Sequence, residues 1–278
     1  MTGVTRRRRL AGRLALGTVL WLASLVVLIP LWMMVIGSFK DAREAALPSV
    51  ALPTAWHPEN YALVFEKGKI AQALANSVLI TASSVALTVA LAAAAALYLA
   101  RVNTRTSRLA YNAFSLGLIA PLSIIPTIRL LQALHINNTY LSVILLFSAL
   151  NIPFAVFLCA GFVKTVPREL DEAAIIDGCG PLALFTQIIL PLLVPVVLTA
   201  AVIVFMGVWN SFIIPLYFLN NSARWTLPLT VYNFFGQYSR DWNLVFADLV
   251  ITAVPVMLFY LAAQKYIISG LTAGAVKG

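Results

Sequence analysis

The stretch 169–191 carries the residue types best suited to recognising a partner in water. Its sequence is ELDEAAIIDGCGPLALFTQIILP, and it holds four of the ten acidic residues of an otherwise apolar chain. Glu172 offers a charge for an ion pair. The small Ala173 and Ala174 beside it give a shallow helix face that a groove on another protein can approach closely. The chemistry on offer is protein docking; the alternative is an ordinary solvated loop between two membrane spans.

Residue patterns for catalysis or nucleotide binding do not stand out in the sequence. There is no GxxxxGK[ST] phosphate loop, and the one Gly-Lys pair, Gly68-Lys69, is followed by Ile70. No Ser/His/Asp, Cys/His or paired-carboxylate arrangement is present. The two cysteines, Cys159 and Cys179, suggest neither a disulfide framework nor a zinc site. We therefore expect no catalytic residue, no metal site and no enzymatic activity in this chain.

The docking stretch predicts a helix, a break and a second helix. Its acidic residues at 169, 171 and 172 crowd the first turn, where the helix dipole favours negative charge. Gly178 and Gly180 can adopt the backbone angles that end this helix. Pro181 suits the first position of a second helix running to Leu190.

The composition is that of an integral membrane protein. Of the 278 residues, 61% are hydrophobic and only 10% are charged, which is outside the range of soluble domains. A spanning helix needs about 20 apolar residues, and continuous rather than alternating apolar runs favour helices over a barrel. The sequence predicts a single all-α transmembrane domain, 1–278, with six transmembrane helices. They cover residues 14–36, 70–99, 109–131, 140–163, 191–215 and 244–268, with a polar loop at 164–190 and a tail at 269–278.

The basic residues indicate how the chain lies in the membrane. The net charge is +9, but the basic side chains are scattered between the spans, so we expect no nucleic-acid partner. With the N-terminus inside, twelve basic residues fall on cytoplasmic segments and seven on outer segments. This bias follows the positive-inside rule. It places both termini and the loop 164–190 in the cytoplasm.

The docking stretch resembles the EAA loop of bacterial ABC importer permeases. The residues that carry the resemblance are Glu172, Ala173, Ala174, Asp177, Gly178, Phe185, Ile188, Leu190 and Pro191. Within this family the chain is most similar to the smaller permease subunit of maltose-type transporters, which has a similar glycine-rich C-terminus. The tail residues that would contact the ATPase are Gly270, Leu271, Thr272, Gly274 and Lys277. Two departures are Cys179, where a small residue is usual, and the pair Gly180-Pro181.

The resemblance implies a type I importer-like fold in which the EAA loop is a cytoplasmic coupling helix. It implies a permease subunit that forms half of the translocation channel of an ATP-driven sugar importer, above all for oligosaccharides, in the bacterial cytoplasmic (inner) membrane. The implied partners are a second homologous permease subunit in a heterodimer, two ATPase subunits or domains, and an extracytoplasmic sugar-binding protein. ATP and Mg²⁺ would be bound by the ATPase, so this chain itself would hold no cofactor. Glu172 would pair with a basic residue of the ATPase, and Gly178 would make the sharp turn.

Several polar residues inside the spans are candidates for the substrate path. Ser77 and Thr81 share one face of the second span with Ser84 and Thr88. Such a hydroxyl face indicates either close helix packing or a permeation path. Arg129 lies near the outer end of the third span, where it either snorkels to the surface or borders the cavity.

Two further positions could meet a sugar. Sugars are bound by aromatic faces together with amide and hydroxyl groups, so Trp209 and Asn210 are the first pair to consider; an interfacial anchor is the alternative for Trp209. Asn151, two residues before Pro153, either satisfies a local backbone group or faces a watery cavity. In maltose-type systems the partner permease can supply most of the sugar site.

Three rival functions remain open. The substrate of an importer could instead be glycerol phosphate or another polar solute, but Arg129 is the only candidate arginine for an anionic cavity. A stand-alone secondary carrier usually needs intramembrane carboxylates, and Asp248 is the only acid well inside an apolar stretch. A membrane scaffold without transport would tolerate mutation of the loop.

Overall fold

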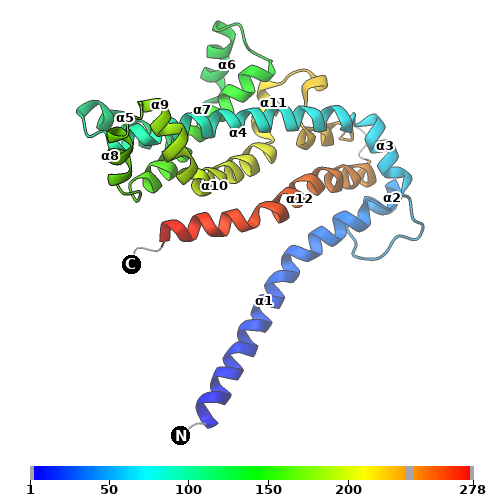
Figure 1. The fold of residues 1–278 in the computed structure, drawn as a ribbon. Coiled ribbons are helices and arrows are strands. Elements are labelled where there is room, and N and C mark those ends of the chain that lie inside the picture. The colour runs from blue at the N-terminus through cyan, green and yellow to red at the C-terminus, as the bar shows by residue number, and fades with distance from the viewer. Residues whose placement is uncertain (1–2, 236–240, 276–278) are drawn as a thin grey trace. The chain divides into compact units, whose positions relative to one another are not determined.

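Every regular element in the described part of the chain is a helix. The computed structural model describes the backbone of residues 3–235 and 241–275 and the side chains of residues 16–235 and 241–264 (Figure 1). The longer helices are α1 (Gly3–Gly37), α4 (Ile70–Arg101), α5 (Arg105–Gly117), α6 (Ile124–Ala133), α7 (Tyr140–Val163), α10 (Leu190–Trp209) and α12 (Trp242–Ala275). The shorter ones are α2 (Ala42–Ala45), α3 (Glu59–Lys67), α8 (Glu169–Ile176), α9 (Pro181–Ala183), η1 (Leu184–Ile189), α11 (Ile213–Phe218), η2 (Ser222–Arg224) and η3 (Leu227–Asn233).

Two compact units make up the chain, and each is described by itself. Unit 1 comprises residues 1–70 and 230–254, and unit 2 comprises residues 71–229 and 255–278. Unit 1 therefore holds α1, α2, α3 and the first part of α12. Unit 2 holds α5 to α11, nearly all of α4, and the rest of α12 from Pro255 onward.

Five helical segments of the described residues are long and apolar enough to cross a membrane. They are Leu16–Gly37, Ile70–Arg101, Tyr140–Val163, Pro181–Trp209 and Trp242–Gln264. The predicted span 140–163 coincides with α7, and the predicted starts and ends of the first two spans lie within two residues of these segments. An all-α membrane fold is thus confirmed. The count of six spans stays a prediction.

The third predicted span, 109–131, is not one helix. It is divided between α5, which ends at Gly117, and α6, which begins at Ile124. The intervening residues include Pro121, whose nitrogen cannot donate a hydrogen bond and whose ring disfavours a helical Ala120 before it. Where we expected a kink, the helix is interrupted.

The fifth predicted span, 191–215, is also shifted. Its helix begins ten residues earlier, at Pro181, and α10 ends at Trp209, with the short α11 following separately. Pro191 lies inside this longer helix, within the first turn of α10, where a missing backbone N–H is tolerated. The boundary between loop and span is therefore not at Pro191.

A buried polar network around Asn60 holds unit 1 together. The side-chain amide of Asn60 donates to the carbonyls of Ser38 and Lys40, both at 2.9 Å, and its Oδ1 accepts from Asn243 at 2.9 Å. These bonds join the turn after α1, helix α3 and the start of α12. Removing one partner would leave the others buried without a bond, which is the expensive case.

Two carboxyl groups lie on the exposed side of unit 1. Asp41 caps α2, where its Oδ1 accepts from the backbone N–H of Glu44 at 2.7 Å, and this bond lowers the pKa of Asp41 below its usual value. Glu59 lies 2.6 Å from Nδ1 of His57, and that side-chain hydrogen bond lowers the pKa of Glu59. Both groups favour the ionised form of the carboxyl.

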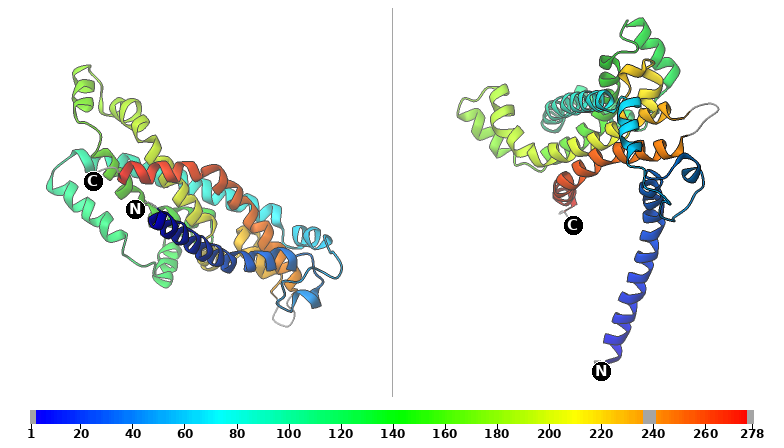
Figure 2. Two further views of the ribbon diagram at one scale, coloured as in Figure 1. Left: turned by 90° about the horizontal axis from the view of Figure 1, so that it is seen from below. Right: turned by 90° about the vertical axis from the view of Figure 1, so that its right-hand side faces the viewer.

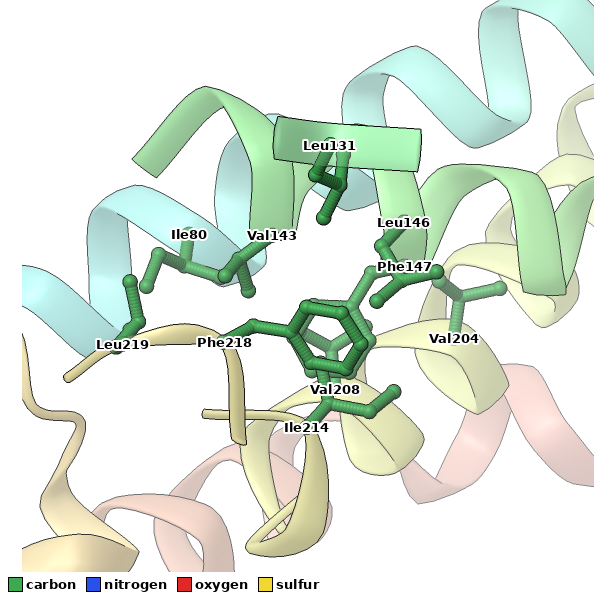
Figure 3. Packing of buried hydrophobic residues seen from close by; sticks show 10 residues of the cluster. All are labelled: Ile80, Leu131, Val143, Leu146, Phe147, Val204, Val208, Ile214, Phe218 and Leu219. Carbon is green, nitrogen blue, oxygen red and sulfur yellow. The ribbon is translucent and has the colours of Figure 1, made fainter. Parts of the chain in front are cut away.

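The core of unit 2 lies between α4, α7 and α10. Figure 3 shows side chains from these helices, from α6 and from the segment around α11 pointing toward one another. The cluster consists of Ile80, Leu131, Val143, Leu146, Phe147, Val204, Val208, Ile214, Phe218 and Leu219. Toward the other ends of the same three helices, a second cluster is formed by Ala96, Cys159, Ala160, Val163, Ile189, Leu193 and Val196.

A polar network fixes the loop after α11 to unit 2. The amide of Asn76 on α4 donates to the carbonyls of Ala223 and Trp225 at 3.0 and 2.9 Å, and its Oδ1 accepts from the hydroxyl of Tyr140 at 2.9 Å. Arg224 donates to the carbonyl of Asn138, which has a positive φ of 58° in the turn before α7. The tight turn expected at this position is confirmed.

Candidate functional site

Helix α8 is an eight-residue helix closed by a glycine turn. Its last carbonyls accept from the N–H groups of Gly178 (to Ile175, 3.0 Å) and Cys179 (to Ala174, 2.9 Å), the pattern of a Schellman motif. Gly178 has φ +83°, a conformation that costs a residue with Cβ about 1–2 kcal/mol. Gly180 has φ −72° and makes no such demand. The turn thus depends on Gly178 alone.

One side of α8 and the following turn is exposed and mixes charge with apolar surface. Glu172 and Ala173 are exposed, as are Ile175 (61%), Ile176 (84%) and Leu182 (75%). Ala174, expected to share the exposed face, is instead 4% exposed. Contiguous apolar side chains in a loop rich in carboxylates are typical of a protein-binding surface. The sequence pattern pointed to Glu172 but gave no emphasis to the isoleucines and Leu182.

An ion pair attaches α8 to the end of α4. Nε of Arg101 lies 2.6 Å from Oδ2 of Asp171, and Nη2 donates to Oδ1 at 3.3 Å. Nη1 donates to the carbonyl of Val166 at 3.1 Å. The two charged side chains are only 13% and 14% exposed. The sequence gave no sign of this pair, because its members lie 70 positions apart.

The second half of the docking stretch runs without a break into the membrane span. From Pro181 the chain passes through α9 and the π-helical η1 directly into α10. Phe185, Ile188 and Leu190 are half-buried in this segment, and Ile188 packs against the cluster around Leu193. The second helix predicted to stop at Leu190 is therefore the beginning of the span. Figures 1 and 2 show α8 and α9 at the end of unit 2 where α4 finishes.

The C-terminal tail is described only in part. Gly270, Leu271, Thr272 and Gly274 belong to the backbone of α12, which extends to Ala275. Lys277 lies outside the described residues. The expected tail contact with an ATPase stays a prediction.

The hydroxyl face of α4 is buried inside unit 2. Ser77, Thr81, Ser84 and Thr88 are each at most 2% exposed. Oγ of Ser77 accepts from the N–H of Leu227 at 2.8 Å. This burial favours the packing interpretation of the face, because small hydroxyl side chains let helices approach closely. A role of Ser77 and Thr81 in the substrate path would need a rearrangement that opens this face.

Asn151 and Arg129 have ordinary surroundings. The amide of Asn151 donates to the carbonyl of Phe147 at 2.8 Å, one turn earlier on α7. Local satisfaction of a backbone group, one of the two expectations for Asn151, is thus present. Arg129 is exposed on α6.

Trp209 and Asn210 border two different hollows of unit 2. Trp209 is 4% exposed and stacks on Phe205 with ring centroids 5.4 Å apart. It lines an open groove of about 530 Å³ between α4, α10 and α12, with walls of valine, alanine and aromatic side chains. Asn210 is exposed, donates to the carbonyl of Met206 at 2.9 Å and borders a smaller hollow of about 330 Å³. The pair does not face one common polar site.

Buried acids and metal ligands offer no second site. Asp248 is 1% exposed in unit 1 and accepts from the hydroxyl of Thr230 at 2.7 Å. Within the described residues there is no group of three or more His, Cys, Asp or Glu side chains that could hold a metal ion.

Comparisons with known proteins agree with this architecture. The family model described as binding-protein-dependent transport system inner membrane component matches residues 86–272. The probable starch degradation products transport system permease protein AmyC of Thermoanaerobacterium thermosulfurigenes is 33% identical over 256 residues, covering 91% of this chain and 93% of AmyC. The multiple sugar-binding transport system permease protein MsmG of Streptococcus mutans is 35% identical over 264 residues, covering 93% and 95%.

A solved structure has the same fold. A chain of a bacterial ABC transporter involved in the import of the acidic polysaccharide alginate superposes with a TM-score of 0.81. The alignment covers 94% of this chain and 98% of that chain, at 19% sequence identity. At this identity the likeness concerns the fold.

Proposed function

This chain belongs to the family of binding-protein-dependent transport system inner membrane components, the permease subunits of ABC importers, and we propose that it forms half of the translocation channel of an oligosaccharide importer. It is a multi-pass membrane protein and a transporter subunit. ATP and Mg²⁺ are held by a partner ATPase. The loop around α8 and both termini face the cytoplasm, as the positive-inside bias supports.

The observation that carries the mechanism is the exposed face of α8. In the proposal this face, with Glu172, Ile175, Ile176 and Leu182, seats in a cleft of the ATPase. Glu172 pairs there with a basic residue, and the two isoleucines fill the apolar part of the cleft. Gly178 makes the turn that lets the loop protrude. Burial of exposed apolar area drives such docking, while the charge sets its register.

The connections of α8 explain how docking moves the channel. Arg101 and Asp171 join α8 to α4, and the continuous helix 181–209 joins the other side of the loop to α10. Closure of the ATPase dimer displaces α8 as a rigid body, and these two connections carry the displacement to both helices. Because α4 and α10 both contribute to the packed core of unit 2 (Figure 3), they shift together and open the channel to the outside.

The substrate assignment follows the relatives. AmyC and MsmG are described as permeases for starch degradation products and for multiple sugars. A sugar is therefore the substrate we propose, delivered by an extracytoplasmic binding protein, with a second permease completing the channel. The apolar walls around Trp209 favour the idea that the partner permease supplies most polar contacts to the sugar. Asn151, Trp209 and Asn210 then shape the cavity.

A secondary carrier is the rival from another class. Such a carrier needs an intramembrane carboxylate that is open to its coupling ion. In the described spans the one buried acid, Asp248, has its Oδ1 bonded to Thr230. This arrangement is that of a structural hydrogen bond, so it favours the ATP-driven reading.

The first test is capture of the chain from its native membranes. The proposal expects an ATPase, a second permease and a sugar-binding protein to be recovered with it, and ATP hydrolysis to rise when the binding protein is added. Uptake by the purified chain alone, driven by an ion gradient, would establish the secondary carrier instead.

The second test reverses one charge. Glu172→Lys sets a positive charge against the basic cleft; because like charges in contact cost several kcal/mol, uptake should fall roughly tenfold or more. Glu66→Lys on α3, also an exposed acid, is the charge-matched control. Both variants should insert into the membrane in normal amounts. Normal uptake by Glu172→Lys would refute the docking mechanism.

A further inference from the structure

A polar pocket lies where α4, α5 and the end of α7 meet in unit 2. Its volume is about 460 Å³, within the range of small-ligand sites. Its polar side chains come from three separate segments of the chain. They are Asn103, Ser107, Arg108, Asn112, Lys164 and Arg168.

The charge of this pocket is entirely positive. Arg108, Lys164 and Arg168 line it, and no acidic residue does. Asp171, three residues after Arg168, is already paired with Arg101. The ammonium of Lys164 lies 5.0 Å from the ring centroid of Tyr111, a cation–π contact that holds it against the pocket wall. Three cations without a facing acid demand an anionic ligand.

The pocket lies at the level where two apolar helices end. Helix α4 ends at Arg101 and α7 at Val163, and both are long enough to cross a membrane. The same region exposes apolar side chains of the amphipathic α5, with Leu109 at 69% and Leu116 at 68%. A ligand that is anionic at one end and apolar at the other fits this combination.

We propose that this pocket binds the phosphate headgroup of an anionic phospholipid. Arginine presents paired N–H donors to phosphate oxygens, and lysine adds a point charge. The amides of Asn103 and Asn112 suit the hydroxyl groups of a phosphoglycerol head. Basic pockets between spans on the cytoplasmic side are the type of site that holds such lipids.

The consequence is a lipid bound beside the coupling helix. Arg168 immediately precedes α8, so the bound headgroup braces the start of that helix against α5. The cytoplasmic location rests on the proposed function and its orientation, whereas the pocket and its charge do not.

The test measures lipid retained by the full complex, captured from membranes and placed in nanodiscs of phosphatidylcholine with a minor fraction of phosphatidylglycerol. Native mass spectrometry counts bound phosphatidylglycerol. Each basic residue contributes about fivefold to the affinity for an anionic lipid, so the triple variant Arg108→Gln, Lys164→Gln, Arg168→Gln should bind roughly 100-fold more weakly. The matched control replaces three exposed basic residues outside the pocket: Lys67→Gln, Lys69→Gln and Arg105→Gln. It should retain the lipid.

Three outcomes would overturn the proposal. Undiminished phosphatidylglycerol in the triple variant would remove the pocket as its site. Binding of inorganic phosphate by the wild type without retention of lipid would make free phosphate the ligand. Loss of the ATPase subunit from the triple variant with an unchanged lipid count would assign the pocket to a protein interface. Failure of the wild type to bring down an ATPase bears on the proposed function only, since the lipid count is read on this chain.

Discussion

Replacing Asp171 with asparagine removes one charge from the connection between α8 and α4 while keeping the size of the side chain. In the structure the carboxylate faces both Nε and Nη2 of Arg101, at 2.6 and 3.3 Å. Asparagine can retain one neutral hydrogen bond to the guanidinium. The variant therefore leaves Arg101 nearly buried with a weaker partner.

The expected loss is about 2 kcal/mol. Hydrogen bonds to charged groups contribute about 1.5–3 kcal/mol, and side chains only 13% and 14% exposed are little screened by solvent. The bond from Arg101 to the carbonyl of Val166 remains and keeps the loss below that of a fully broken buried pair, which is about 3–5 kcal/mol. Since 1.4 kcal/mol corresponds to a factor of ten, local opening of α8 should become roughly 30-fold more frequent.

Hydrogen exchange of the α8 amides measures this opening. The amides of Glu172 and Asp177, bonded within the helix at 3.1 and 2.9 Å, should exchange roughly 30-fold faster in Asp171→Asn. Glu169→Gln is the matched control, because it removes an acid from the same first turn and so reproduces the lost interaction with the helix dipole. Its effect should stay within about threefold.

A double variant decides whether the pair itself is responsible. Arg101→Gln with Asp171→Asn should be less destabilised than the sum of the two single variants by about 1–3 kcal/mol, as contacting residues are. Additive effects, or equal exchange in Asp171→Asn and Glu169→Gln, would refute the inference that this ion pair holds α8 to α4.

Three further predictions concern the turn, the core and the exposed cap. Gly178→Ala should destabilise the turn after α8 by about 1–2 kcal/mol, measured by thermal unfolding in nanodiscs. Gly180→Ala should be nearly neutral, because a Cβ at either glycine meets nothing within 4 Å and only Gly178 has a positive φ; equal effects would contradict the strain argument. Leu193→Ala should cost about 1–2 kcal/mol in the same assay, less than in a soluble core, because lipid is as apolar as the core and only the cavity term remains. Leu192→Ala, at a 40% exposed position, should cost little, and a similar loss at both sites would argue against the packing of α10. The carboxyl of Asp41, followed by NMR, should titrate below 3.8; its contribution to stability is present above the unfolded-state pKa and is lost as the pH falls through the lower, folded-state pKa. A pKa at or above 3.8 would mean that the cap does not form.

Local patterns were sufficient for much of the fold. The apolar run 140–163 is bounded by a capping threonine and a lysine, and α7 occupies the same residues. Gly178 was expected to end the acidic helix, and its positive φ confirms this. In both cases the signal and the structure lie within a few consecutive residues.

The features that sequence reasoning missed depend on contacts between distant residues or on competition between similar conformations. Arg101 and Asp171 carry no mutual signal along the chain. The break before Ile124 was expected as a kink, because proline alone does not determine whether a helix bends or stops. Burial of Ser77 and Thr81 was left open, since one hydroxyl face suits a protein interior and a watery path equally well.

The π-helical turn between Leu184 and Ile189 also bears on how this chain can change over evolution. A bond from residue i to residue i+5 encloses one residue more than a turn of α-helix, so the segment holds one residue in excess of what a regular helix from α9 to α10 needs. Deleting one residue here would tighten the turn and rotate everything before it by about 100° relative to α10. The exposed face of α8 would then point in a new direction while α10 kept its packing. A single-codon change in this turn is thus a route by which a permease could adapt to a different ATPase without rebuilding its membrane core.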